Sequence, residues 1–202
     1  MAQRHPEWVL GFSDEVWWSR LNHPALHAWS SPDQPLRLLA QQLPKADPDP
    51  KALACYGLLL SCPAAPRSLP EQVWLRFVTG RPVSAVTTQF LDWCTTKLAA
   101  LGKRVWLLVW DNASWHRSQH VRAWIRAHNR QVKGSGQGVR ILACFLPIKS
   151  PWLNPIEPRW LHTRRRVLEP NRLLSAAELE LRVCQSLGAQ LEPRLVLPDK
   201  VL

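Results

Sequence analysis

Two carboxylates stand out because they lie in a strongly basic part of the sequence. The stretch Gly102–Arg172 holds 14 basic residues and three acids, namely Asp111, Glu157 and Glu169. Asp111 directly follows the apolar run Val105–Trp110, which is typical of a strand buried on both faces. The carboxyl end of such a strand is where α/β sheets place their chemistry, so Asp111 is a candidate catalytic carboxylate. A turn in which Asp-Asn bonds its own backbone explains the pattern equally well.

Glu157 lies near the start of a helix that the sequence predicts over about residues 155–168. With Asn154 as the N-cap and Pro155 as the first helical residue, Glu157 takes the third position, which is capping-box spacing. Burying a carboxylate is costly unless it binds something positive, so an inward-facing Glu157 would suit a metal ligand. We expect Glu157 to share one face of this helix with Trp160, Leu161, Arg164 and Leu168. This largely apolar face should pack on the sheet.

The third candidate comes from the acidic pair Asp14 and Glu15, which follows a short strand predicted over Trp8–Phe12. Adjacent residues of an extended chain point to opposite sides, so only one of the two would face a given site. The sequence leaves open which of them that is. A solvated turn is the alternative.

The charge distribution favours a polyanionic partner. The net charge is +11, and residues 102–202 hold 17 basic and 7 acidic residues, against 9 and 8 in residues 1–101. One-sided positive charge is typical of nucleic-acid binding, although a generally basic protein would also show it. The candidate phosphate contacts, which would otherwise be solvated helix faces, are Arg122, Arg126, Arg130, Arg164, Arg165 and Arg166.

Composition also limits the class of protein. No apolar run is long enough to span a bilayer, and the first residues lack a signal-peptide core, which predicts a cytoplasmic protein with no membrane contact. The five cysteines form no Cys-x-x-Cys pair, so we expect buried, reduced thiols and no cysteine-bound metal. They are Cys55, Cys62, Cys94, Cys144 and Cys184.

Hydrophobic periodicity predicts a single α/β domain over residues 1–202. Three early strands with short connections suggest an antiparallel meander, and later strands separated by helices suggest parallel neighbours. The expected fold is a mixed five-stranded sheet with helices on both faces. Its strands are expected at about 8–12, 53–60, 73–78, 105–110 and 139–146, and its helices at about 83–101, 117–130, 155–168 and 175–188.

Two motifs carry a resemblance to a known family. Asp111-Asn-Ala-Ser-Trp-His116, followed by Ser150-Pro-Trp-Leu-Asn-Pro-Ile-Glu-Pro-Arg-Trp160, resembles the paired signature of DDE-superfamily transposases, in the mariner-like branch of bacterial insertion sequences. The second motif is highly specific and the first moderately so. Phe12-Ser-Asp-Glu15 and Ala54-Cys-Tyr-Gly-Leu58 resemble the family's opening strands weakly. The resemblance spans about Trp8 to Leu168.

The resemblance implies an RNase H-like fold in which the first and fourth strands are neighbours. It implies that Asp14, Asp111 and Glu157 are the catalytic residues and hold two Mg²⁺ or Mn²⁺ ions, with His116 and Asn154 as accessory residues. His116 would contact the scissile phosphate or orient Asp111, and a purely structural role near the start of a helix explains it equally well. The implied activity is metal-dependent cleavage of DNA at transposon ends and strand transfer into target DNA, in a bacterial, nucleoid-associated protein.

The sequence departs from the family in two places. The 45 residues between Asp111 and Glu157 are more than is usual, and the surplus fits the Gly134–Gly138 loop. Met1 stands 13 positions before Asp14, so we expect the family's amino-terminal helix-turn-helix domains to be absent. A helix-turn-helix half that is encoded separately is one possible partner of the chain. A second copy of the chain, in a homodimer, is another.

Two other functions therefore compete with the transposase. One is a catalytically inactive relic that acts only as a basic DNA-binding or assembly domain, and the other is a generic RNase H-like nuclease.

Near the two motifs, we expect Trp115, Trp152 and Trp160 to pack the site and not to stack on bases.

Overall fold

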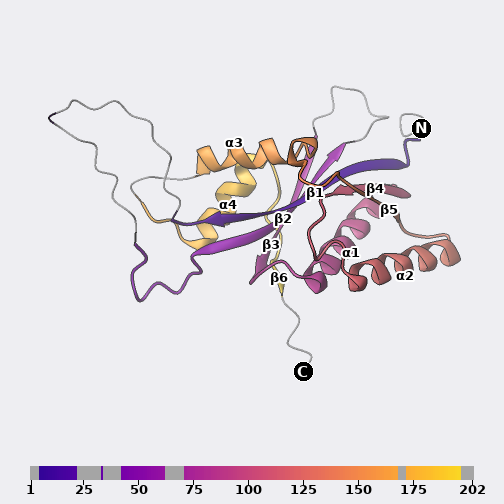
Figure 1. Ribbon diagram of the computed structural model, residues 1–202, viewed down its shortest axis with the longest axis horizontal. Helices are drawn as coiled ribbons and strands as arrows, with labels where there is room; N and C mark the ends of the chain where they lie inside the picture. The colour runs from indigo at the N-terminus through magenta and orange to yellow at the C-terminus, as the bar shows by residue number, and fades with distance from the viewer. Residues whose placement is uncertain (1–4, 22–32, 34–41, 62–70, 168–171, 197–202) are drawn as a thin grey trace.

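The computed structural model describes residues 5–21, 33, 42–61, 71–167 and 172–196. It contains one six-stranded sheet in the order β5-β4-β1-β2-β3-β6 (Figure 1). The strands are β1 (Trp8–Ser19), β2 (Ala52–Ser61), β3 (Gln72–Thr79), β4 (Val105–Trp110), β5 (Arg140–Phe145) and β6 (Leu195–Val196). The helices are α1 (Ser84–Ala100), α2 (Gln119–Ser135), α3 (Glu157–Val167) and α4 (Ala176–Leu187), with a 3-10 turn, η2, at Pro151–Leu153.

The predicted pairing is confirmed and the predicted strand count is one too low. β1, β2 and β3 form an antiparallel meander, whereas β4 lies parallel to β1, and β5 parallel to β4. The sixth strand, β6, pairs with β3 at only two positions, so no periodic pattern marks it. The expectation of short early connections is wrong for residues 20–51, which join β1 to β2.

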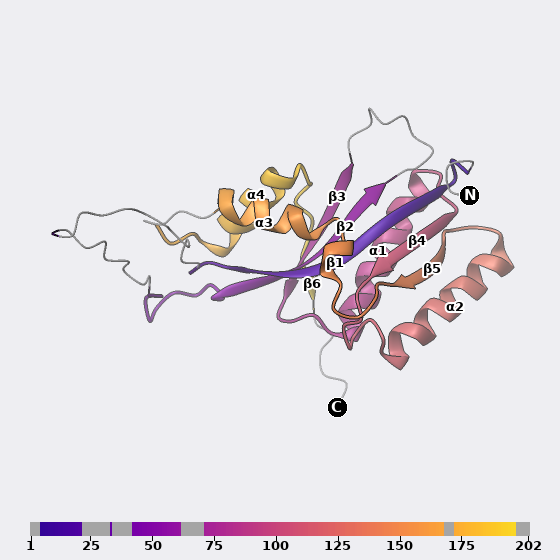
Figure 2. The same ribbon diagram turned by 45° about the horizontal axis from the view of Figure 1, so that its top comes forward.

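Helices cover both faces of the sheet, as predicted. Figure 2 shows α1 and α2 on one side and α3 and α4 on the other. The first pair closes a core around Trp106 and Phe90, and the second closes a core around Phe77 and Trp160. These two layers fix β1 and β4 in the middle of the molecule, where their side chains meet residues from both sides.

β1 is longer than expected, and this changes the position of Asp14. The strand runs to Ser19 because Val16 and Trp18 pack into the core under α3 and α4. Asp14 lies on this same face, in the middle of the strand and not in a turn after it. Glu15 faces the opposite side, as the two-residue period predicted.

Cysteine burial follows the prediction with one exception. Cys55, Cys94 and Cys184 are buried free thiols, but Cys144 is exposed, because it lies on the edge strand β5 where no helix covers it. Cys62 lies outside the described residues. Among the described helices, none has the length and apolar character needed to cross a membrane.

Candidate active site

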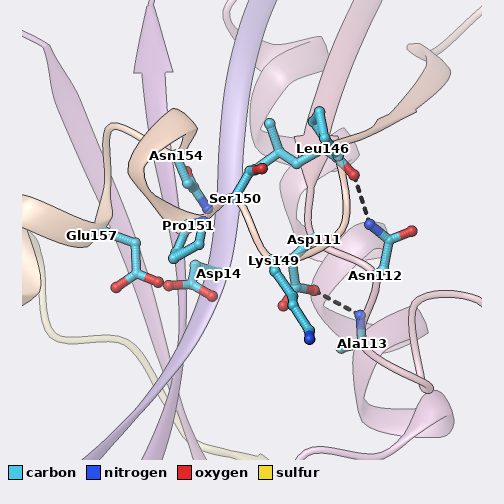
Figure 3. A pocket seen from close by; sticks show the side chains of 11 residues that line it. Asp14, Asp111, Asn112, Ala113, Leu146, Lys149, Ser150, Pro151, Asn154 and Glu157 are labelled. Atoms are coloured by element: carbon cyan, nitrogen blue, oxygen red, sulfur yellow. Dashed lines mark hydrogen bonds between the residues drawn. The ribbon is translucent and has the colours of Figure 1, made fainter.

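A pocket of about 300 Å³ opens where β4 ends (Figure 3). It is formed where the end of β4, the middle of β1 and the segment that leads into α3 meet. Asp14, Asp111 and Glu157 all line it, although they lie far apart in the sequence. The other lining residues are Asn112, Ala113, Leu146, Pro147, Lys149, Ser150, Pro151 and Asn154.

Asp14 is the most buried of the three carboxylates. The indole Nε1 of Trp160 donates a hydrogen bond of 2.9 Å to Asp14 Oδ2. Burial, followed by repulsion from Glu157 and Glu15, raises the pKa of Asp14 to about 7. A buried carboxylate that is crowded by other acids is stabilised by a nearby cation.

Gly57 makes room for this contact. It is the cross-strand partner of Asp14, and a Cβ atom on it would lie 2.3 Å from Cη2 and 2.5 Å from Cζ2 of Trp160. Trp160 is held in place from the side by an edge-on contact with Trp18. The indole therefore reaches Asp14 only because the residue beneath it has no side chain.

We expect Gly57→Ala to lower the free energy of unfolding by about 1–3 kcal/mol, because overpacking strains a closed core. The measurement is urea unfolding followed by circular dichroism. Gly134→Ala is the matched control, since a Cβ atom there meets nothing within 4 Å and lies in the last turn of α2. Equal stability of Gly57→Ala and the unaltered protein would contradict this packing.

Asp111 belongs to a chain of three side chains that spans β4 and β1. Its Oδ1 accepts hydrogen bonds from the backbone N of Ala113, at 2.9 Å, and from Nδ1 of His116, at 2.8 Å. The other ring nitrogen of His116 lies 2.8 Å from Glu15 Oε1, and Trp115 Nε1 donates to Glu15 Oε2 at 3.1 Å. His116 thus connects Asp111 to the far face of β1.

The surroundings of His116 favour its charged form. Burial alone would lower the pKa of His116, but the charge of Glu15 and the hydrogen bonds to Asp111 and Glu15 raise it to about 9. The imidazole also stacks on Trp110 with a ring separation of 4.4 Å. In return, the hydrogen bond from His116 lowers the pKa of Asp111. The imidazolium holds Asp111 ionised and oriented.

Glu157 opens helix α3 and is not its third residue. The capping box predicted with Asn154 is wrong, because the Asn154 side chain points back to β1. Burial raises the pKa of Glu157. The positive charge of Arg164 lowers this pKa, and the negative charge of Asp111 raises it further, so the net shift is upward. The predicted inward stripe also needs correction. Leu161 and Arg164 are exposed, Leu168 lies outside the described residues, and the residues that turn inward are Ile156, Trp160, Thr163 and Val167.

Asn154 ties this segment to the strand that carries Asp14. Its Nδ2 donates to the backbone O of Ser13 at 3.2 Å, across 141 positions of sequence. Its Oδ1 is buried and has no hydrogen-bond partner. An unpartnered buried oxygen is costly, and a cation or a bound water would satisfy it.

The pocket therefore has the chemistry of a divalent-cation site but not yet its geometry. Carboxylate and amide oxygens are the ligands that Mg²⁺ and Mn²⁺ prefer. Within the described residues, however, no three His, Cys, Asp or Glu side chains are placed to hold one metal ion. Figure 3 shows Asp14 and Glu157 facing each other, with Asp111 across the pocket from them. The Asp111 side chain is 53% exposed, and its Oδ1 is held by Ala113 N and His116 Nδ1, so a metal ion would have to draw the three carboxylates together.

The six candidate arginines are exposed, but none of them lines the pocket. Arg122, Arg126 and Arg130 lie on the outer face of α2, opposite the half-buried Trp124 and Ile125. The other three are on α3, on the opposite side of the sheet. Arg164 is partly engaged by the protein itself, because its Nη2 donates to the backbone O of Trp17 at 3.4 Å. The two groups therefore do not form one continuous contact surface next to the carboxylates.

Sequence reasoning missed two features of the site. It left Glu15 as an alternative ligand, whereas Glu15 faces away from the pocket and pairs with His116. It also did not single out Lys149, which lines the pocket and has a positive φ of 58°. The two-residue period of β1 was the available signal for Glu15, and a lone basic residue at the start of the Ser150–Trp160 motif was the signal for Lys149.

Known proteins share this fold. Solved structures of Mos1 match the chain at 13–17% identity. One of them is the Mos1 mariner paired end complex with Mn, which matches at a TM-score of 0.58 with 15% identity. The match covers 89% of this chain and 48% of that chain. The Mos1 transposase paired-end complex with left transposon end matches at a TM-score of 0.57 with 16% identity, over 90% of this chain and 48% of the other. The chain thus spans about half the length of these proteins. The likeness confirms the RNase H-like fold.

The sequence comparisons are narrower. No curated protein matches the chain. Residues 75–180, just over half of the chain, match the family described as DDE superfamily endonuclease. The match includes Asp111, His116 and Glu157 and begins after Asp14. The chain belongs to the DDE superfamily of endonucleases.

Proposed function

We propose that this chain is the catalytic domain of a DNA transposase of the mariner-like, bacterial insertion-sequence type. It would cut DNA at the ends of a mobile element and join the freed end to target DNA. The observation that carries the proposal is that Asp14, Asp111 and Glu157 line one pocket in a chain of the DDE endonuclease superfamily. The structures that it resembles include a Mos1 transposase complex with the left transposon end and Mos1 paired end complexes with Mn and with Mg, which supports the same substrate and metals.

The oxygen ligands of the pocket suit a pair of divalent ions in their chemistry. Asp14, Asp111 and Glu157 would hold them, and the unpartnered Asn154 Oδ1 is a further neutral oxygen at the pocket wall. Two bound Mg²⁺ or Mn²⁺ ions supply an activated water and stabilise the leaving oxygen of a phosphodiester. Three carboxylates around two divalent ions would leave the site nearly neutral in charge.

The remaining groups of the pocket would position the DNA strand. Lys149 provides a positive charge at the rim for a phosphate. His116 holds Asp111 and is itself buried, so it would orient the carboxylate and not touch DNA. Because the released 3′-hydroxyl would attack at the same pocket, no covalent link between protein and DNA is needed.

The test is a nicking assay on a supercoiled plasmid that carries the DNA from both sides of the gene, where the inverted repeats of a mobile element would lie. We expect nicking with Mg²⁺ or Mn²⁺ and none with EDTA or Ca²⁺ alone. Retained DNA binding without nicking in either metal would overturn the enzyme assignment and support a DNA-binding or assembly role. Cleavage confined to RNA–DNA hybrids would support the generic RNase H-like nuclease instead.

A further inference from the structure

Trp152 is the most exposed large hydrophobic side chain among the described residues. It is 75% exposed, and the nearby Ile148 is 71% exposed. By contrast, Trp106, Trp110 and Trp160 are almost completely buried. The expectation that Trp152 packs the site is therefore wrong. Trp side chains are enriched at interfaces, where the ring packs on a partner.

The backbone presents Trp152 in a fixed place. It is the middle residue of η2, which begins at Pro151 and is closed by a 2.8 Å hydrogen bond from Asn154 N to the O of Pro151. The Asn154 side chain ties the same turn to Ser13, the neighbour of Asp14. The indole is thus carried on a rigid turn that is anchored to the strand of the catalytic pocket.

Trp152 also belongs to the segment that lines that pocket, although it is not itself a lining residue. Ser150 and Pro151 before it and Asn154 after it line the cavity, and Lys149 contributes a positive charge from the same segment (Figure 3). The net charge of the whole chain is +11, which favours a polyanion as its partner. A flat aromatic ring beside a cation is the combination that binds unpaired nucleotides, since the ring stacks on the base and the cation contacts the phosphate.

We propose that Trp152 stacks on an unpaired base of the DNA strand whose phosphodiester enters the pocket. The inference rests on the proposed function for the identity of the strand, but the stacking itself is a binding property that can be measured without cleavage. Trp152 would act as a positioning residue. It would hold the nucleotide next to the scissile phosphate out of the duplex, so that the phosphate reaches Asp14, Asp111 and Glu157.

The experiment measures binding of a short single-stranded oligodeoxynucleotide in Ca²⁺ by fluorescence anisotropy. We expect Trp152→Ala to weaken binding about 5- to 150-fold, the range that corresponds to the loss of one stacked base. Trp152→Phe should keep most of the affinity. The matched control is Leu181→Ala, which removes an exposed apolar side chain from α4, away from the pocket.

A set of oligonucleotides with one abasic position each then tests stacking directly. One position should weaken binding to the unaltered protein and have no further effect on Trp152→Ala, because ring and base form one interaction. Equal binding by both proteins, or no position that couples to Trp152, would overturn the proposal. Failure of the unaltered protein to bind single strands would also overturn it. The same holds if Trp152→Ala leaves DNA binding unchanged but converts a dimer to a monomer in ultracentrifugation. If nicking fails while this coupling is found, the proposed enzyme falls and the stacking site stands.

Discussion

Replacing Asp111 with Asn is expected to reduce metal-dependent nicking at least about 1,000-fold while the protein still folds and binds DNA. The substitution keeps the shape of the side chain and its acceptor for Ala113 N, but removes the negative charge. A bound metal contributes several kcal/mol to stabilising the transition state, and each 1.36 kcal/mol is worth a factor of ten. Loss of one charged ligand therefore accounts for a decrease of this size.

Glu157→Gln should have the same effect and is the cleaner variant, because Glu157 makes no contact with His116. The nicking assay in Mg²⁺ and in Mn²⁺ measures both. Asp92→Asn is the matched control, since Asp92 is an exposed acid on α1. Nicking by Asp111→Asn at the rate of the unaltered protein would rule out a role for this carboxylate.

The second large effect is expected from Glu15→Gln, about 10- to 100-fold slower nicking with little change in DNA binding. Glu15 lies on the face of β1 away from the pocket and reaches Asp111 only through His116. Residues that hold a ligand in this way typically contribute one to two orders of magnitude to metal affinity or rate. Gln can still accept a hydrogen bond from His116, but without the charge of Glu15 the pKa of the buried His116 falls, and the charged form that holds Asp111 is lost.

Manganese affinity, measured by calorimetry on Asp14→Asn and Glu15→Gln, separates the two acids. We expect Asp14→Asn to abolish binding and Glu15→Gln only to weaken it. Glu71→Gln is the control, because its ion pair with Arg159 is exposed and such pairs contribute little. If Glu15→Gln abolished binding and Asp14→Asn did not, the neighbour on the other face of β1 would be the ligand.

Local patterns were enough to predict part of this arrangement. The unbroken apolar run before Asp111 predicted β4 with its correct bounds, and the helical spacing of Val86, Phe90 and Cys94 predicted α1. The prediction that Asp14 follows its strand is wrong. The strand continues past Asp14 because Val16 and Trp18 pack against α3 and α4, which come much later in the chain.

The contacts that complete the site have no local signal. Asn154 reads as a helix cap from its neighbours alone, yet its side chain bonds Ser13 on a distant strand. Trp160 bonds Asp14 across a gap that exists only because Gly57 lies beneath it. Such contacts form only when segments far apart in the sequence come together in the folded protein. The two-residue strand β6 likewise forms only by pairing with the distant β3.

The most direct test of the central claim is an anomalous difference map from crystals soaked in Mn²⁺. We predict manganese peaks in the pocket, within about 2.5 Å of oxygens of Asp14, Asp111 and Glu157, which the metal would draw together. Saturating Mn²⁺ that leaves this pocket without a peak, or a peak that none of the three carboxylates contacts, would contradict the account.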